Sequence, residues 1–318
     1  MKNIIFSFNP PTPDGTLANT RTATFLADHL DLPLICDKSI KEQTDVDILF
    51  LVAGVFLYCR CLPELAVAVE NAKRVVWVQN DYTIMPPKDD GAAESPFRFA
   101  FRKRRMDGKP PTDFWTTMKS YSTKTDGSAY LNWNSMAYEH MSDKDFEASW
   151  EDGKRGNSVL YFGADRAGRL DYFNRYFIGQ EAPVTISTFS KSMARYNEHA
   201  DVVSMFPRTK FKECMQEFPL GLYLEDKKSH QIFTSPATRF YEMLGTGMAM
   251  VFQPAAVHML AEAGYQVGPY TVAPEGLSDA LSRARDTAKL QRAWATPAIV
   301  RNLKSRIDTE YTRLKGLI

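Results

Sequence analysis

The sequence predicts an α/β fold made of two facing Rossmann-like halves with a cleft between them, and three observations support this prediction. Short apolar runs alternate with amphipathic segments of helical length along most of the 318 residues. Polar and proline-rich sequence interrupts this alternation near the middle of the chain, after which it resumes. Hydrophobic residues make up 44% and charged residues 24%, which are globular proportions that exclude collagenous, low-complexity and wholly disordered chains.

The first half of the chain predicts a parallel sheet. Its strands are short apolar runs, and its helices have apolar residues at helical spacing. Strands separated by helices in this way form a parallel sheet with helices on both faces. The predicted strands are residues 4–8, 32–36, 47–52 and 74–78, and the predicted helices are residues 20–30 and 62–71.

The middle of the chain departs from this alternation of strands and helices. Residues 86–111 are rich in proline and basic side chains, and residues 142–157 are polar and charged. Such stretches are typical of domain boundaries. We therefore expect a first domain at residues 1–155, a second at residues 156–296, and a C-terminal helix at residues 297–318 that returns to the first domain.

The second half repeats the alternating pattern. We expect the last helical stretch to be interrupted at Pro297. Ligands of such sheets bind at the carboxyl ends of the strands, here in the cleft between the domains. The predicted strands are residues 158–162, 184–189, 202–206, 220–224 and 248–252, and the predicted helices are residues 169–177, 238–244, 255–262 and 287–314.

Charge and composition restrict the class of protein. With 39 Lys and Arg against 38 Asp and Glu, the net charge of +1 excludes a uniformly basic nucleic-acid coat, although a local basic patch remains possible. No apolar run reaches the roughly 18–20 residues of a membrane span. The first residues are typical of a strand and not of a signal peptide. Four cysteines make no disulfide framework, so we expect a cytoplasmic protein, and we expect it to be a monomer without a membrane partner.

The most informative segment is residues 235–247, SPATRFYEMLGTG. Ser235 or Thr234 is placed to cap a helix whose free N–H groups bind phosphate. Arg239, in the first turn, can add a bidentate contact, and Glu242 shares its face and can accept both hydroxyls of a ribose. A capped surface helix with an ion pair between these two side chains explains the segment equally well.

A second segment, residues 161–169, joins a predicted strand to a helix through the sequence YFGADRAGR. Gly163 and Gly168 allow close approach of the backbone, while Arg166 and Arg169 offer cationic contacts to a diphosphate. The alternative is a plain strand–loop–helix connection with solvated arginines.

Two further candidate groups lie in the first half. Asp81 directly follows a buried strand, where functional side chains of open α/β sheets collect, although it can equally be a turn residue. Phe97, Phe99 and Phe101 alternate in a way that fits one face of a strand, or an apolar wedge beside a flipped base, with basic residues around them. Such a patch fits DNA phosphates, and the alternative is a solvated basic loop with phenylalanines in the core. The basic residues that we assign to DNA are Arg98, Arg102, Lys103, Arg104, Arg105 and Lys109.

These motifs, in this order, resemble those of the bacteriophage DNA β-glucosyltransferases of the T-even phages, which are GT-B enzymes. The resemblance rests on a glycine turn with two arginines before a helix, on an R-x-x-E helix, and on an aspartate after the fourth strand. Here the last of these is the sequence WVQNDYTIMP, which contains Asp81. The resemblance covers most of the chain but is scattered. The loops that follow residues 86 and 110 do not match the family pattern, which leaves the sugar and the acceptor base open.

The resemblance implies an inverting transfer of a hexose, which we expect to be glucose, from a UDP-sugar to a hydroxymethylpyrimidine in double-stranded DNA. Asp81 would take the proton of the acceptor hydroxyl, and the arginines would stabilise the leaving diphosphate. An enzyme of this kind reaches its base by flipping it out of the duplex. The residues that we assign to the donor are Gly163, Arg166, Arg169, Tyr223, His230, Ser235, Arg239 and Glu242.

No Cys, His and Asp cluster has the spacing of a tightly held metal, so we expect none, although Mg²⁺ or Mn²⁺ can accompany a diphosphate. Two other functions fit the same features. One is a GT-B glycosyltransferase with a small-molecule, glycan or protein acceptor, which would show no dependence on DNA. The other is a two-lobed binding protein without chemistry, which would be expected to carry an export signal.

Overall fold

The computed structural model describes residues 2–7, 18–52, 62–79, 96–116, 129–130, 155–207, 210–226, 236–262, 264–316 and 318. The chain divides into two compact units, which are described separately. One comprises Met1–Met136 and Ile307–Ile318, and the other comprises Ala137–Arg306. The sequence places the divisions after residues 155 and 296, whereas these units change at residues 136–137 and 306–307.

The first unit contains a sheet whose strand pairs are all parallel among the described residues. The strand order is β2-β1-β3-β4-β5-β6, a doubly wound arrangement. The strands are β1 (Asn3–Phe6), β2 (Leu34–Ile35), β3 (Ile48–Val52), β4 (Arg74–Gln79), β5 (Asp113–Thr116) and β6 (Ala129–Tyr130).

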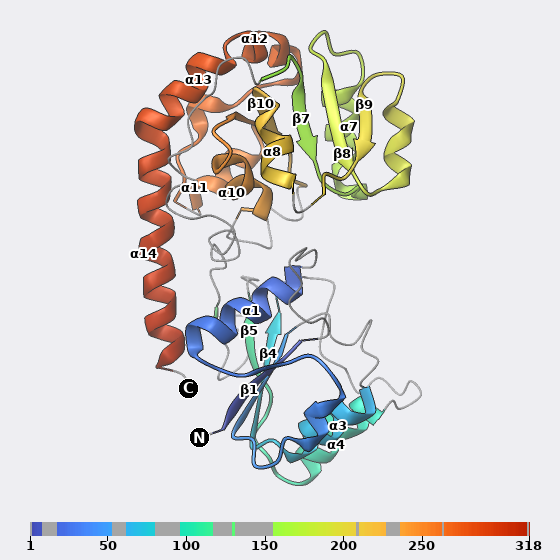
Figure 1. The fold of residues 1–318 in the computed structure, drawn as a ribbon, viewed down its shortest axis with the longest axis vertical. Helices are drawn as coiled ribbons and strands as arrows, with labels where there is room; N and C mark the ends of the chain where they lie inside the picture. Colours follow the sequence, from blue (N-terminus) through green and yellow to red (C-terminus); the bar gives the residue numbers. More distant parts are fainter. Residues whose placement is uncertain are drawn as a thin grey trace. The chain divides into compact units, whose positions relative to one another are not determined.

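Helices cover both faces of this sheet (Figure 1). Helix α1 (Ala18–Leu30) packs on one face, where Leu26 meets Phe50 and Val76 of the strands. Helices α3 (Leu62–Asn71) and α4 (Pro96–Met106) cover the opposite face around Trp77. A short 3₁₀ helix, Lys38–Glu42, adds Ile40 to this second core.

Helix α4 corrects one expectation from the sequence. The alternation of Phe97, Phe99 and Phe101 suggested a strand, but these residues lie within a helix of 11 residues. Ala100 is buried in the core and Phe101 packs against it, while Phe99 is exposed. Helical spacing therefore decides which side chains face the sheet.

The second unit repeats the architecture with the strand order β11-β10-β7-β8-β9, again with parallel pairs throughout the described residues. One face carries α7, α12 and α13, whose apolar residues form a single core with the strands. The strands are β7 (Val159–Phe162), β8 (Val184–Thr188), β9 (Asp201–Ser204), β10 (Leu220–Tyr223) and β11 (Ala249–Phe252). The helices are α7 (Leu170–Phe177), α8 (Phe211–Gln216), α10 (Thr238–Leu244), α11 (Ala256–Glu262), α12 (Leu277–Ser282) and α13 (Ala284–Leu290), and the 3₁₀ turns are Ala167–Arg169, Lys191–Tyr196, Gly268–Tyr270 and Pro274–Gly276.

The C-terminal helical stretch is interrupted, but not at Pro297. A π-helical segment, Gln291–Ala295, separates α13 from α14 (Thr296–Lys315). Pro297 lies in the first turn of α14, where its missing N–H disturbs no helical hydrogen bond. Helix α14 begins in the second unit and ends in the first, where Leu314 is buried in the core beside α1.

Two parallel sheets, each covered by helices, confirm the predicted α/β class with two Rossmann-like halves. None of the helices in the described part of the chain has the length and apolar character that crossing a membrane requires.

Candidate functional site

A buried cluster of arginines and carboxylates lies at the carboxyl ends of β7 and β10. Arg169 ends the 3₁₀ turn Ala167–Arg169 that follows β7, and Arg239 lies in the first turn of α10. Glu225 and Asp226 follow β10 after one intervening residue, Leu224. Because β7 and β10 are parallel neighbours, the residues that follow them meet at one edge of the sheet.

Glu225 binds both arginines. Arg169 Nη2 donates to both of its carboxylate oxygens, at 2.6 and 3.0 Å, and Arg239 Nη2 donates to Oε1 at 2.5 Å. Arg169 Nε also lies 3.6 Å from a carboxylate oxygen of Asp226. The side chains of Arg169, Arg239 and Glu225 are only 7%, 10% and 5% exposed, so these charges interact with little screening by water.

Two tyrosines complete the cluster. The hydroxyl of Tyr161, in β7, accepts hydrogen bonds from Arg169 Nη1 at 3.4 Å and from Arg239 Nη1 at 3.3 Å. The Arg239 guanidinium also lies 5.8 and 5.7 Å from the ring centroids of Tyr161 and Tyr223. The Tyr223 hydroxyl accepts a hydrogen bond from the Ala237 amide at 2.9 Å, which ties the start of α10 to β10.

Electrostatics keeps Arg239 charged and Tyr223 neutral. Burial lowers the pKa of Arg239, but the adjacent Glu225 carboxylate, together with Tyr161 and Tyr223, more than offsets this and raises the pKa above its ordinary value. Burial, followed by the negative charge of Glu225, raises the pKa of Tyr223 well above that of a free phenol. The cluster therefore presents a permanent cation beside a neutral hydroxyl.

Each of the two glycines in the loop after β7 lies against side chains of the cluster. Gly163 adopts φ +149°, and an added Cβ would lie 3.1 Å from both Arg239 Nη1 and the Tyr161 hydroxyl. An added Cβ at Gly168 would lie 3.1 Å from the Cβ of Asp226. A Cβ at either position would push its neighbours by a few tenths of an ångström, and at Gly163 the positive φ also favours glycine.

Asp165 ties the loop after β7 to the segment of residues 190–195, which follows β8. Its carboxylate accepts hydrogen bonds from Arg195 Nη1 and Nη2, at 2.7 and 2.9 Å, and from Ser192 Oγ at 2.6 Å. Its backbone amide donates to Ser190 Oγ at 2.9 Å. The hydrogen bond from Arg195 is the main reason that the pKa of Asp165 lies below its usual value.

The structure brings together part of the predicted donor set. Arg169, Arg239 and Tyr223 meet beside Gly163 as described above. Arg166 is exposed and lies at the start of the 3₁₀ turn, outside the buried cluster. Glu242 is half-buried on α10.

Two donor candidates, His230 and Ser235, lie outside the described residues, as does the catalytic candidate Asp81. The prediction that Ser235 caps the helix is wrong, because α10 begins at Thr238 and the residue at its N-cap is Ala237.

The residues assigned to DNA divide into two groups. Arg104 is 2% exposed, and its guanidinium donates to the carbonyls of Val69, Ala72 and Lys73 at the end of α3. Arg104 is therefore a structural residue and cannot contact a DNA phosphate, which corrects that assignment.

Lys109 and Lys103 are also engaged with α3. The Lys109 ammonium donates to the carbonyls of Glu70 and Ala72, and Lys103 pairs with the Glu70 carboxylate at 2.6 Å. Arg105 is exposed and Arg102 half-buried, with the Arg102 guanidinium 5.5 Å from the ring centroid of Phe99. The side chain of Arg98 lies outside the described residues.

Sequence reasoning missed Glu225, Asp226 and Tyr161. Two consecutive acids directly after a buried strand were the available signal for the carboxylates. Their pairing with the arginines depends on β7 and β10 being neighbours, which no local spacing shows.

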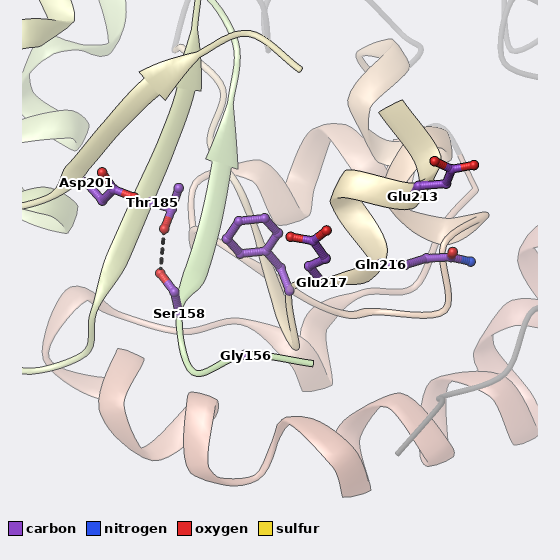
Figure 2. A pocket seen from close by; sticks show the side chains of 8 residues that line it. Gly156, Ser158, Thr185, Asp201, Glu213, Gln216 and Glu217 are labelled. Carbon is purple, nitrogen blue, oxygen red and sulfur yellow. Dashed lines mark hydrogen bonds between the residues drawn. The ribbon is translucent and has the colours of Figure 1, made fainter. Parts of the chain in front are cut away.

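A hollow lies at the opposite edge of this sheet, away from the cluster, and is a different site. It is a pocket of about 700 Å³ around the amino ends of β7, β8 and β9, and Figure 2 shows its lining residues. The hydroxyls of Ser158 and Thr185 meet there at 2.8 Å. Across the described residues, no group of three or more His, Cys, Asp or Glu is arranged to hold a metal ion, in this pocket or elsewhere.

The two parallel α/β units are consistent with the two-domain GT-B fold. No family profile and no curated protein matches the sequence. Solved structures do match. A mutant of T4 phage β-glucosyltransferase in complex with UDP-glucose aligns with a TM-score of 0.69 and 11% identity, covering 100% of this chain and 99% of that one.

Two further structures agree with this match. T4 phage β-glucosyltransferase in complex with UDP and Mn²⁺ gives a TM-score of 0.65 at 12% identity, with 100% and 99% coverage. A DNA-modifying β-glucosyltransferase, studied with and without uridine diphosphoglucose, gives 0.64 at 13% identity with the same coverage. The resemblance stated from the sequence motifs is therefore confirmed at the level of the fold.

Proposed function

We propose that this protein is a glycosyltransferase that moves glucose from UDP-glucose to the hydroxymethyl group of a modified pyrimidine in phage DNA. The observation that carries the proposal is the buried pair of arginines at the carboxyl ends of β7 and β10. That edge is where α/β sheets bind nucleotides. The shared fold with glucosyltransferases that bind UDP-glucose supports the same reading.

The donor half of the reaction follows from the chemistry of the cluster. A guanidinium group offers five N–H donors in a fixed plane, and the contacts to Glu225 and Tyr161 use only some of them. The rest can bind the diphosphate as negative charge grows on it in the transition state. Glu242, three residues after Arg239 on α10, would accept the ribose hydroxyls.

The acceptor half is assigned to Asp81. Its carboxylate would take the proton of the hydroxymethyl group while that oxygen attacks the anomeric carbon. As the new C–O bond forms, the bond between the anomeric carbon and the diphosphate oxygen breaks, and UDP leaves with the electron pair. Attack from the face opposite the leaving group inverts the configuration.

The acceptor surface is proposed on the first unit. Arg102 and Arg105 of α4 would contact DNA phosphates, with exposed Phe99 on the same helix. The target base would be flipped out of the duplex at a cost of a few kcal/mol. The protein would act as a monomer in the cytoplasm of the host cell.

A divalent cation would enter this site with the diphosphate. The structure of the T4 enzyme with UDP and Mn²⁺ supports this proposal. In the described part of the chain we assign no protein ligands to such an ion, because no suitable cluster of side chains is present there.

The main alternative is the same transfer onto a small molecule, glycan or protein. It is favoured by the engagement of Arg104, Lys109 and Lys103 with α3, which reduces the basic surface available to DNA. The same cluster would serve the donor in either case.

The test is transfer of radiolabelled glucose from UDP-glucose to duplex DNA with and without 5-hydroxymethylpyrimidine. We expect label only in the hydroxymethylated DNA. Asp81→Asn is expected to abolish transfer and leave UDP affinity almost unchanged. If neither DNA acquires label while UDP still binds tightly, DNA is not the acceptor. If Asp81→Asn remains active, the base is another residue.

A further inference from the structure

One oxygen atom joins the two arginines of the candidate site. Glu225 Oε1 accepts a hydrogen bond from Arg169 Nη2 at 2.6 Å and another from Arg239 Nη2 at 2.5 Å. Its second oxygen accepts from Arg169 Nη2 at 3.0 Å. A single carboxylate therefore bridges the two guanidinium groups.

This arrangement requires a negative charge at residue 225. Two like charges in a site this poor in water repel strongly, since the surroundings screen them little. A carboxylate between them turns that repulsion into two charge-assisted hydrogen bonds. Without it, the guanidinium groups would separate or turn toward solvent.

Other contacts hold the carboxylate and the arginines in place. The carbonyl oxygen of Glu225 accepts a hydrogen bond from the buried Gln253 side chain at 2.6 Å, which fixes the segment after β10. On the other side, the Tyr161 hydroxyl accepts from Nη1 of both arginines. Each guanidinium is thus attached at two points, and its plane is fixed.

We propose that Glu225 is a positioning residue that holds Arg169 and Arg239 at the spacing needed to bind a diphosphate. This inference rests on the proposed function, because it assigns those arginines to the diphosphate of the donor. Glu225 itself need not touch the nucleotide. Nη2 of each arginine donates to the carboxylate, and the guanidinium groups have further N–H donors for phosphate oxygens.

The experiment compares the wild-type protein with Glu225→Gln and Glu225→Asp by calorimetric titration. The probes are UDP, inorganic pyrophosphate and uridine, and thermal melting of each unliganded variant reports its stability. Glu217→Gln is the matched control, since Glu217 lies in the pocket at the opposite edge of the same sheet. It should bind every probe as the wild type does.

In Glu225→Gln, we expect the affinity for UDP and pyrophosphate to fall by about tenfold or more, while the affinity for uridine changes less than about twofold. A neutral amide cannot accept from both guanidinium groups, so only the probes that contain a diphosphate should lose affinity. Glu225→Asp retains the charge on a shorter side chain and should lose a smaller part of the affinity. It also provides the test if the glutamine variant fails to fold.

If Glu225 had a merely structural role, Glu225→Gln would lower the melting temperature. It would also weaken the binding of all three probes in proportion, or leave the binding of all three unchanged. Either pattern contradicts the positioning role. Tighter UDP binding in Glu225→Gln would also overturn it, because the carboxylate would then compete with the phosphates. A double variant with Arg239→Gln adds a second check, since the effect of Glu225→Gln on UDP should largely disappear in that background.

The titrations separate this inference from the proposed function. If the wild type binds UDP and Glu225→Gln binds it equally well, the positioning role fails and the donor assignment stands. If the wild type binds pyrophosphate but gains nothing from the uridine of UDP, the donor assignment fails, and the positioning role is judged on pyrophosphate. If it binds neither UDP nor pyrophosphate, both fail.

Discussion

At the scale of single residues, Gly163 and Glu225 show how little of the candidate site can be read from local sequence. A glycine in a loop after a strand is common, and its reason here appears only with Arg239 and Tyr161 placed beside it. The carboxylate between the arginines comes from a different strand, 56 residues from Arg169. Residue types could therefore be predicted, but the identity of their partners could not.

Gly163→Ala is expected to damage the site and the fold together. The substitution forces an alanine into φ +149° and places its Cβ 3.1 Å from the Arg239 guanidinium and the Tyr161 hydroxyl. We expect a loss of about 1–2 kcal/mol in the free energy of unfolding and about a tenfold loss in UDP affinity. Chemical denaturation and calorimetry measure the two effects.

Gly179→Ala is the control for backbone strain. Gly179 adopts φ +69° after α7, and nothing lies within 4 Å of an added Cβ. It should lose stability by about 1 kcal/mol and leave UDP affinity unchanged. Equal effects of the two alanines on binding would contradict the role given to Gly163.

Asp165 predicts a pH dependence of stability. Its pKa is lowered in the folded protein, chiefly by Arg195, so its contribution is present above the ordinary value of about 4 and is lost as the pH falls through the lowered pKa. The melting temperature of wild type minus that of Asp165→Asn should be constant near neutral pH and shrink below about pH 4.

The control for this titration is Asp279→Asn, because Asp279 pairs with Arg283 on an exposed helix face. Exposed pairs of this kind contribute little to stability. Its melting difference from wild type should be small at every pH. A difference for Asp165→Asn that does not change with pH would show that the carboxylate is not what holds the loop.

At the scale of elements, the strands and most helices follow from apolar periodicity, and the failures have physical causes. Residues 97–101 alternate like a strand but form a helix, because Ala100 and Arg104 of that helix face α3 and the sheet. Strand β6, of two residues, is too short to give a pattern. The interruption before α14 is a π-helix that no proline marks.

Arg104→Ala is expected to loosen the contact between α4 and α3. The substitution leaves the carbonyls of Val69, Ala72 and Lys73 without the guanidinium that now satisfies them. We expect a loss of about 2–3 kcal/mol in the free energy of unfolding. The dependence of DNA affinity on salt should not change, because Arg104 contacts no phosphate.

Arg105→Ala is the matched variant on the exposed side of α4. It should change stability by less than about 0.5 kcal/mol. If α4 binds DNA, the slope of log affinity against log salt should fall by roughly one. An unchanged slope would remove Arg105 from the proposed DNA surface, and a stable Arg104→Ala would contradict the structural role of Arg104.

At the scale of the whole molecule, two parallel α/β units could be predicted because each strand run is bounded by turn residues and followed by a helix. The sheet orders β2-β1-β3-β4-β5-β6 and β11-β10-β7-β8-β9 could not, because pairing between distant strands leaves no local signal. That order is nevertheless what brings Arg169 and Arg239 to the same carboxylate. Fold and candidate site are therefore consequences of one topology.

The most direct test is calorimetric titration of the wild type and of Arg239→Gln with UDP and with uridine. If the cluster binds a nucleoside diphosphate, UDP should bind the wild type about 100-fold more tightly than uridine, and most of that preference should be lost in Arg239→Gln. Equal affinities of the wild type for UDP and uridine, or an undiminished preference in Arg239→Gln, would contradict the assignment of these arginines to the donor.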